Sequence, residues 1–139
     1  MDFAELITRM TGAAARGAGA EVAACFAVDG VYHDVFYGAF QGHAAIADLI
    51  ENHFHRDATD FIWDVHDPVS SGEVGYARHT FSYVSKLSDI AGRRTIFEGV
   101  AICWLKDGLL AEYTELANVY PALSMLGFAD ARIAIPIYS

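Results

Sequence analysis

Hydrophobic residues in the first sixty positions recur with the period of an α-helix. The N-terminal stripe predicts a helix that ends near Gly17 and buries Phe3, Leu6, Ile7, Met10, Ala13 and Ala14. Asp2 and Glu5 form a start that resembles a capping box. A second short helix is predicted over residues 20–26, and a third carries the apolar stripe Ile46, Leu49, Ile50 and His53.

A short strand between the second and third helices carries Tyr32 and Asp34. The pair Asp29-Gly30 predicts a turn into this strand, and a glycine-bounded loop is expected after it. Residues two apart in a strand point to the same face of a sheet. A phenol and a carboxyl group are therefore expected to project together into whatever that face covers.

Beyond residue 60 the pattern changes to strands, which are predicted over residues 61–69, 74–87, 93–105 and 109–119. Lys106-Asp107-Gly108 is typical of a tight hairpin. A short terminal helix is expected over 121–128, followed by an alternating tail with Ile133, Ile135 and Ile137. Helices followed by a run of antiparallel strands predict an α+β fold with the helices on one face of a curved sheet.

The composition predicts an internal cavity or a contact with a second subunit. A chain of 139 residues is enough for one domain, residues 1–139, and too short for two ordinary ones. It is 54% hydrophobic with a mean hydropathy of +0.26. This excess indicates an internal cavity lined with apolar groups or apolar surface shared with a second subunit. We expect a small apolar organic ligand, and a homodimer packed through the convex face of the sheet.

The charge and the chain's ends narrow the possible partners and location. The formal net charge of −9 argues against nucleic acid and anionic membranes as partners. No apolar run approaches the ~20 residues of a membrane span, and the N-terminus lacks the basic region of a secretory signal. Cys25 and Cys103 each lie in an apolar run and are expected to be buried free thiols. These features predict a cytoplasmic protein.

Three segments together resemble one known superfamily. They are residues 17–26 before Asp29, the helix start Gly42-His43-Ala44-Ala45-Ile46, and FEGVAICWLKDGLLAEYTE at 97–115. The chain resembles the nuclear transport factor 2-like superfamily, in particular its SnoaL-like, polyketide-cyclase-like branch, which also holds ketosteroid isomerase and limonene-epoxide hydrolase. The resemblance implies a cystatin-like cone, in which a curved antiparallel sheet wraps around N-terminal helices and encloses a pocket.

The resemblance also implies site residues. The isomerase's general base resembles Asp34, while its two oxyanion donors fall on Met10 and Ala101, which have no side-chain donor of that kind. The tyrosine and asparagine of the epoxide hydrolase resemble Tyr32 and Asp34.

The hydrolase's Arg-x-Asp pair falls on Arg78-His79-Thr80, and its last aspartate falls on Glu115. The threonine removes one carboxylate of that relay, so epoxide hydrolysis is predicted less strongly.

The predicted catalytic groups are Asp34, Arg78, Glu115 and Tyr32. Asp34 is interpreted as a general base, or alternatively as a turn aspartate bound by backbone N–H groups. Tyr32 offers a hydroxyl to a substrate oxygen or is a core tyrosine. Glu115 belongs to the site or is a solvated or interface charge.

The orientation of Arg78 stays open in the sequence. A buried arginine needs a carboxylate partner, which Asp34 or Glu115 could supply; the alternative is a structural ion pair or a place on the convex face. If Arg78 faces inward, alternation along the strand places Tyr76, Thr80 and Ser82 inward and His79, Phe81 and Tyr83 outward.

The predicted pocket has two walls. Ile46, Leu49, Ile50 and His53 form one wall, and Phe97, Ala101 and Cys103 the other. The residues assigned to substrate contact are His53, Ile50, Tyr113, Thr80, Ala101 and Phe97.

The six histidines do not predict a metal site, because they show no His-x-x-x-His or Cys/His cluster. His66 and His79 could instead serve a dehydratase, as histidines do in scytalone dehydratase of the same fold. No phosphate-binding glycine loop or dinucleotide motif is present, so no cofactor is predicted. The function expected is acid–base chemistry on an apolar oxygenated molecule: isomerisation, cyclisation, hydration or dehydration. The alternative is a non-catalytic ligand-binding or dimerisation domain.

Overall fold

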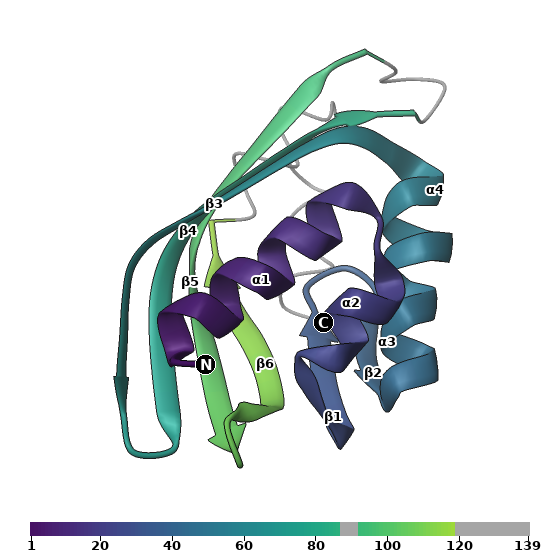
Figure 1. Cartoon of the computed structure of the whole chain (residues 1–139). Coiled ribbons are helices and arrows are strands. Elements are labelled where there is room, and N and C mark those ends of the chain that lie inside the picture. Colours follow the sequence, from purple (N-terminus) through teal and green to yellow (C-terminus); the bar gives the residue numbers. More distant parts are fainter. Residues whose placement is uncertain (87–91, 119–139) are drawn as a thin grey trace.

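The computed structural model describes residues 1–86 and 92–118 as an α+β domain, in which helices fill the concave side of a six-stranded sheet (Figure 1). The helical elements are α1 (Phe3–Arg16), α2 (Gly19–Ala24), α3 (His43–Leu49), the π-helical turn η1 (Ile50–Phe54) and α4 (His55–Asp57). The strands are β1 (Phe26–Asp34), β2 (Gly38–Gln41), β3 (Ala58–Ser71), β4 (Val74–Ser85), β5 (Arg94–Lys106) and β6 (Leu109–Ala117). The predicted fold class is confirmed.

The caps and the apolar stripe of α1 are as predicted. The Asp2 carboxylate accepts a hydrogen bond from the backbone N–H of Glu5 at 2.8 Å. Gly17 ends the helix in the left-handed conformation, with φ of 76°. The buried face packs against β3 and the rest of the core, so the local signals and the tertiary packing agree.

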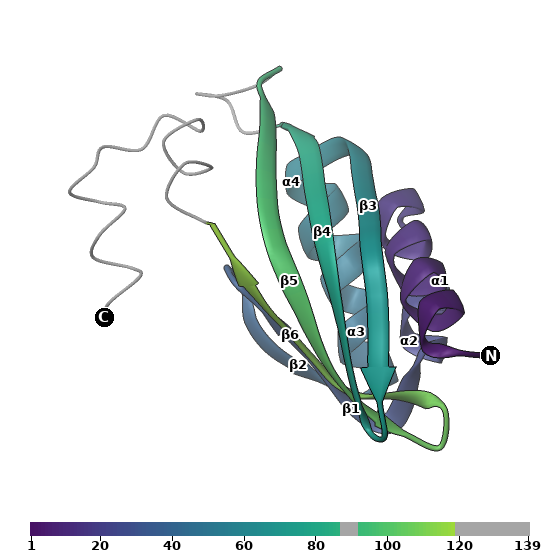
Figure 2. The ribbon, with the colours of Figure 1, turned by 90° about the vertical axis from the view of Figure 1, so that its left-hand side faces the viewer.

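The sheet has the order β2-β1-β6-β5-β4-β3, and Figure 2 views it from its outer side with the helices behind. The four long strands β3 to β6 pair antiparallel, as expected, but β1 pairs parallel to β6. Asp29-Gly30 is not a turn before β1. It lies within that strand, where the pairing with β6 shifts between Phe26 and Val31. The loop expected after β1 contains the additional short strand β2.

Two register shifts bend β3 and extend it beyond the predicted 61–69. They lie between Thr59 and Ile62 and between His66 and Val69 in its pairing with β4. Each contains an aspartate with positive φ, Asp60 at 54° and Asp67 at 51°. Such bulges increase twist and bend a strand, which curves the sheet over the helices.

The core lies between α1, α2, α3 and the concave face of the sheet. Its largest fully buried side chains include Tyr32, Tyr113, Phe26, Leu6, Ile7, Met10, Ile46, Leu49 and Ile50. Cys25 and Cys103 are buried free thiols, as predicted. No helix in the described part of the chain is long and apolar enough to cross a membrane. The predicted helix over 121–128 and the isoleucine tail lie outside the described residues.

Candidate functional site

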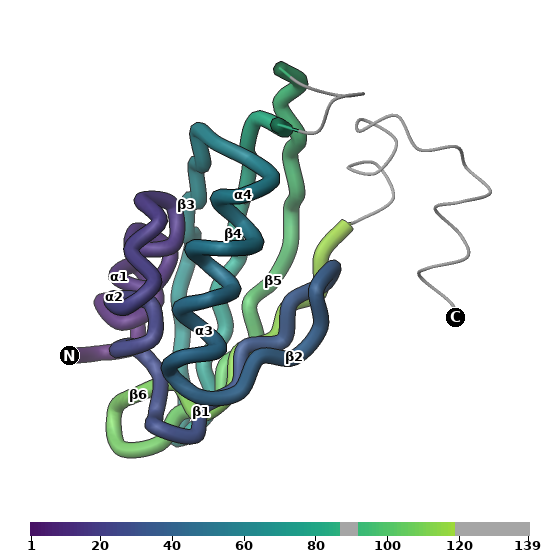
Figure 3. The backbone as a smooth tube through the Cα atoms, turned by 90° about the vertical axis from the view of Figure 1, so that its right-hand side faces the viewer, coloured from purple at the N-terminus to yellow at the C-terminus, as the bar shows by residue number. Residues whose placement is uncertain are grey.

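A cavity of about 240 Å³ lies between the helical segment α3–α4 and the concave face of the sheet. Figure 3 shows this helical segment alongside β3 and β4. More than half of the lining residues are aromatic, and the wall is completed by two alanines, a valine, a serine, a histidine and three acids. The lining is Tyr32, Asp34, Val35, Phe36, Tyr37, Phe54, Asp57, Ala58, Phe61, Trp63, His79, Phe81, Tyr83, Ser85, Phe97, Glu115 and Ala117.

Asp34 reaches the cavity from the end of β1. Its carboxylate accepts hydrogen bonds from the backbone N–H groups of Phe36 and Tyr37, both at 2.9 Å. The carboxylate therefore shapes the turn, as the second interpretation of this residue expected, and it also lines the cavity. Burial raises the pKa of Asp34 to about 6, against the lowering effect of these hydrogen bonds. The carboxylate of Glu115 adds to the rise.

The second polar group of the cavity is a pair formed by His79 on β4 and Glu115 on β6. Nε2 of His79 lies 3.0 Å from Oε2 of Glu115, and the two side chains are only 2% and 14% exposed. The Tyr113 hydroxyl donates a more distant hydrogen bond, 3.3 Å, to the same carboxylate oxygen. A carboxylate oxygen accepts, so Nε2 of His79 is the donor in this contact and Nδ1 is left for a ligand.

Gly99 on the intervening strand β5 makes this pair possible. It is directly opposite His79 in the β4–β5 register and opposite Ala117 in the β5–β6 register. Strands β4 and β6 are two strand spacings apart, so their side chains meet only across β5. A Cβ at Gly99 would lie 2.9 Å from Nε2 of His79 and 2.5 Å from the backbone oxygen of Leu116. The glycine thus leaves the space through which histidine and glutamate touch.

Two tyrosines form the floor beside this pair. The rings of Tyr32 and Tyr113 are 4.8 Å apart, and both residues are buried. Burial, reinforced by the Glu115 carboxylate, raises both tyrosine pKa values well above the ordinary value. Both hydroxyls therefore remain protonated and act as hydrogen-bond donors. Tyr32 lines the cavity as predicted, whereas Tyr113 lies behind the cavity wall.

Arg78 lies outside this cavity, so the structure does not bring it together with Asp34 and Glu115 as the sequence predicted. Its guanidinium donates to Asp67 on the outer face of the sheet, with Nη2 2.8 Å from Oδ2. The two side chains are 66% and 74% exposed. The parity of β4 therefore places His79, Phe81 and Tyr83 toward the cavity. Thr80, assigned to the pocket by the sequence, faces outward beside His66.

The remaining predicted pocket residues separate into wall, core and rim. Phe97 lines the cavity, as expected. Ile50 and Ala101 are fully buried in the core behind it. His53 is outside the lining; its Nδ1 lies 3.2 Å from the Asp48 backbone oxygen, and its ring packs against Tyr37 and another aromatic ring.

Sequence reasoning missed most of the aromatic wall. Phe61 and Trp63 on β3 face Phe81 on β4, with ring centroids 5.8 Å and 4.8 Å from that phenylalanine. The signal in β4 was mixed, because Phe81 and Tyr83 share the parity of His79, while Tyr76 and two valines share that of Arg78. Only the pair Phe81 and Tyr83 indicated that this parity, with His79, faces inward.

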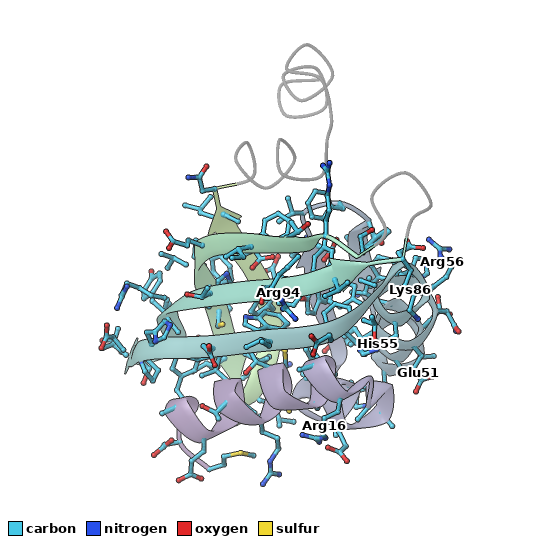
Figure 4. The ribbon with its side chains drawn as sticks, turned by 90° about the horizontal axis from the view of Figure 1, so that it is seen from above. Arg16, Glu51, His55, Arg56, Lys86 and Arg94 are labelled. Atoms are coloured by element: carbon cyan, nitrogen blue, oxygen red, sulfur yellow. The ribbon has the colours of Figure 1, made fainter. Side chains whose placement is uncertain are left out.

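One rim of the cavity is held by a chain of polar contacts. The Tyr37 hydroxyl donates to Asp57 at 2.8 Å, which ties the turn after β1 to α4. Arg56 donates to both oxygens of Asp57, at 2.7 and 2.8 Å. Arg56 and Lys86 lie at the same end of the molecule (Figure 4). Within residues 1–86 and 92–118, no group of three metal-ligating side chains gathers.

Comparison with solved structures gives the same fold at low sequence identity. An LEH-like epoxide hydrolase from M. tuberculosis is 16% identical with a TM-score of 0.72, covering 96% of this chain and 92% of its own. A protein from Catenulispora acidiphila with a ketosteroid isomerase-like fold, solved with trimethylamine, is 13% identical with a TM-score of 0.78, over 90% and 94%. An NTF2-like protein of unknown function from Burkholderia pseudomallei is 15% identical with a TM-score of 0.74, over 90% and 97%.

These likenesses show the fold, and the sequence itself shows the family. No curated protein matches the chain significantly. The family model described as the SnoaL-like domain matches residues 7–113, which is well over half of the chain. The predicted relationship is thereby confirmed, and the chain belongs to the SnoaL-like domain family.

Proposed function

We propose that this protein is an enzyme that moves protons on a small oxygenated molecule held in the cavity. The observation that carries the proposal is the buried contact of His79 with Glu115 in a cavity that Asp34 also lines. Base, acid and hydrogen-bond donors share one largely apolar space, where electrostatic interactions are strong. Catalytic side chains in such places supply about 10²- to 10⁴-fold in rate.

Asp34 serves as the general base. With a pKa near 6, its carboxyl group is mostly ionised at neutral pH and is more basic than an exposed aspartate. It removes a proton from a carbon beside a carbonyl, so that the C–H electron pair becomes that of an enolate. The Tyr32 hydroxyl has no hydrogen-bond partner among the described residues and is available to the substrate oxygen.

His79 serves as the proton donor or acceptor on the other side of the substrate. In a dehydration, Asp34 takes the carbon-bound proton, and a protonated His79 gives its proton to the leaving hydroxyl, which departs as water. The Glu115 carboxylate holds the ring in place through Nε2, and Nδ1 carries the proton that is transferred. Hydration is the same sequence in reverse.

Hydration or dehydration is supported better than the two neighbouring chemistries. The positions of the isomerase's oxyanion donors are Met10 and Ala101, both in the core and without suitable donors. The Arg-x-Asp pair of the epoxide hydrolase falls on Arg78 and Thr80, both outside the cavity. Cyclisation by enolate attack remains compatible with the same base.

The experiment is a turnover screen in D₂O with small β-hydroxy carbonyl compounds and their dehydrated products. Proton NMR follows deuterium incorporation beside the carbonyl and loss or gain of water. We expect turnover by the native protein, loss of at least about 100-fold in Asp34→Asn and in His79→Gln, and unchanged rates in the matched control Arg78→Gln. Equal rates in the native protein and both site variants would refute the acid–base assignment.

The alternative is a ligand-binding domain that uses the same cavity without chemistry. The screen separates the two, because ligand binding detected by calorimetry with no exchange or water transfer across the panel would favour the alternative.

We also propose that the outer sheet face forms a homodimer. Its exposed apolar residues are Tyr76, Ile96, Val100, Trp104 and Leu116, with Leu116 70% exposed and opposite Val100 in the β5–β6 register. Exposed apolar side chains from three neighbouring strands suit a self-complementary contact between two copies.

A further inference from the structure

The charges around the cavity have one sign. Asp34, Asp57 and Glu115 line it, and none of the described lining residues is lysine or arginine. His79 is the only basic side chain of the described lining, and it is already in contact with Glu115. An anionic ligand would meet carboxylates with no fixed positive charge to receive it, so the lining selects against carboxylates and phosphates.

The three acids differ in how well they are satisfied. Asp57 at the rim receives two hydrogen bonds from Arg56 and one from Tyr37. Asp34 has backbone N–H donors and no ion-pair partner among the described residues. It also lies close enough to Glu115 for that carboxylate to disfavour its ionised form. Among the described residues, Asp34 thus lacks a contacting cation, although His53 favours its ionised form weakly, and the Glu115 carboxylate disfavours that form.

The walls offer aromatic surface to a cation. Phe81 is at the centre of the ring cluster, with Phe61 5.8 Å, Trp63 4.8 Å and Phe97 6.2 Å from it by ring centroid. The negative faces of such rings attract a positive charge within about 6 Å. Rings and carboxylates around one cavity are the two features that recognise alkylammonium groups, since the methyls contact the rings and the charge is balanced by the acids.

We propose that the ligand carries a small tertiary or quaternary ammonium group, held between Asp34 and the aromatic wall around Phe81. The cavity volume of about 240 Å³ limits the ligand to a small molecule. This inference rests on the proposed function only in using the same cavity, and it names the substrate class: an oxygenated amine instead of a neutral carbonyl compound.

The test compares two probes of the same shape by calorimetry on the native protein. Choline carries a trimethylammonium group, and 3,3-dimethylbutan-1-ol has a carbon in place of its nitrogen and no charge. We expect choline to bind at least about tenfold more tightly, because the aromatic rings and the carboxylates together attract the charged probe and not the neutral one. Equal or tighter binding of the neutral alcohol overturns the inference, and so does an absence of choline binding at millimolar concentration.

Variants locate the charge that is recognised. Asp34→Asn should abolish the preference for choline over the alcohol, and Arg78→Gln on the outer face should preserve the preference. Glu115→Gln provides a second acid variant if Asp34→Asn does not fold. A preference that survives both acid variants overturns the inference. If the protein turns over neutral carbonyl compounds but shows no preference for choline, the inference of an ammonium ligand is wrong. The proposed acid–base function would still stand.

Discussion

Two side-chain contacts made by adjacent residues of β4 show how differently the two faces of one sheet are used. Arg78 contacts Asp67 on the outer face, where both partners are more than half exposed. His79 contacts Glu115 on the inner face, where the side chains are 2% and 14% exposed. Two consecutive residues thus lie in an exposed and a buried environment, because successive side chains of a strand point to opposite faces of the sheet.

The difference teaches that partner chemistry alone does not identify a site. A guanidinium–carboxylate pair in water contributes little, because solvent screens it and ordering two long side chains costs entropy. A histidine–carboxylate pair removed from water interacts more strongly and carries a desolvation cost that the fold must meet elsewhere. The inner pair also borders a cavity, where a ligand can use it. The predictions below test this contrast from the largest expected effect to the smallest.

The largest effect is expected on the outer face, through the proposed dimer. Leu116→Glu places a charge in the middle of the apolar face of both copies. With about 2 kcal/mol or more lost per copy, the dimer dissociation constant should rise about 1000-fold. Analytical ultracentrifugation over a concentration series measures this. A native protein that stays monomeric at tens of micromolar contradicts the dimer.

The next effect concerns the pH dependence contributed by Asp34. Its folded pKa of about 6 exceeds the ordinary 3.8, so its ionised form is disfavoured in the folded state. The stability it contributes is full below 3.8 and is lost as pH rises through about 6. Asp34→Asn removes this loss and should stabilise the protein by up to about 3 kcal/mol above pH 6, with little difference at acidic pH.

Urea unfolding of the native protein and Asp34→Asn across this pH range gives the difference directly. Asparagine keeps an oxygen for the backbone N–H groups of Phe36 and Tyr37, so the turn remains intact. A constant difference between the two proteins at every pH would mean that Asp34 is not desolvated in the folded state. If Asp34→Asn is more stable but inactive, the Asp34 carboxylate destabilises the fold and is needed for function.

The third effect tests the space between His79 and Glu115. Gly99→Ala places a Cβ against the Leu116 backbone oxygen and His79, and backbone cannot move aside as a flexible side chain can. We expect a loss of about 1–3 kcal/mol in the free energy of unfolding, together with a broken His79–Glu115 contact. The matched control is Gly12→Ala in α1, where the nearest atom is the flexible end of Arg16 at 3.5 Å.

Calorimetric melting of both glycine variants gives the stability change. Gly12→Ala should be neutral or stabilising, since alanine favours a helix by up to about 1 kcal/mol over glycine. Similar melting temperatures for the two variants would show that β5 and β6 adjust freely and that Gly99 holds no essential space.

Much of the fold could be predicted from local signals. The stripe and caps of α1, the hairpin at Lys106-Asp107-Gly108 and the four long strands all follow from periodicity and turn residues. The bulges in β3 could not be anticipated, because aspartates with positive φ at Asp60 and Asp67 look like ordinary polar strand residues. The parallel pairing of β1 with β6 joins distant segments, and no local pattern encodes it.

The site was predictable only where strand parity was clear. Tyr32 and Asp34 line the cavity as the shared strand face implied, and Phe97 and Glu115 also line it. The sequence left the orientations of Arg78 and His79 open, because aromatic residues occupy both parities of β4, and the family resemblance led to the assignment of Arg78 to the site. The role of Gly99 could not be predicted from the sequence, because it depends on the register of three neighbouring strands, β4, β5 and β6.

The smallest effect is expected for the outer ion pair itself. Arg78→Gln removes the contact with Asp67 and leaves a side chain of similar length on an exposed surface. The free energy of unfolding should change by about 0.2–1 kcal/mol, and less at high salt, because screening already weakens the pair. Urea unfolding at low and high ionic strength measures both values. A loss of several kcal/mol that persists in salt would mean that Arg78 is withdrawn from water, as it would be within the dimer interface. The effect of Arg78→Gln on the free energy of unfolding should therefore also be measured in the Leu116→Glu background. If the pair is purely exposed, this effect is equally small in both backgrounds. If the pair lies in the dimer interface, the effect differs between the two backgrounds.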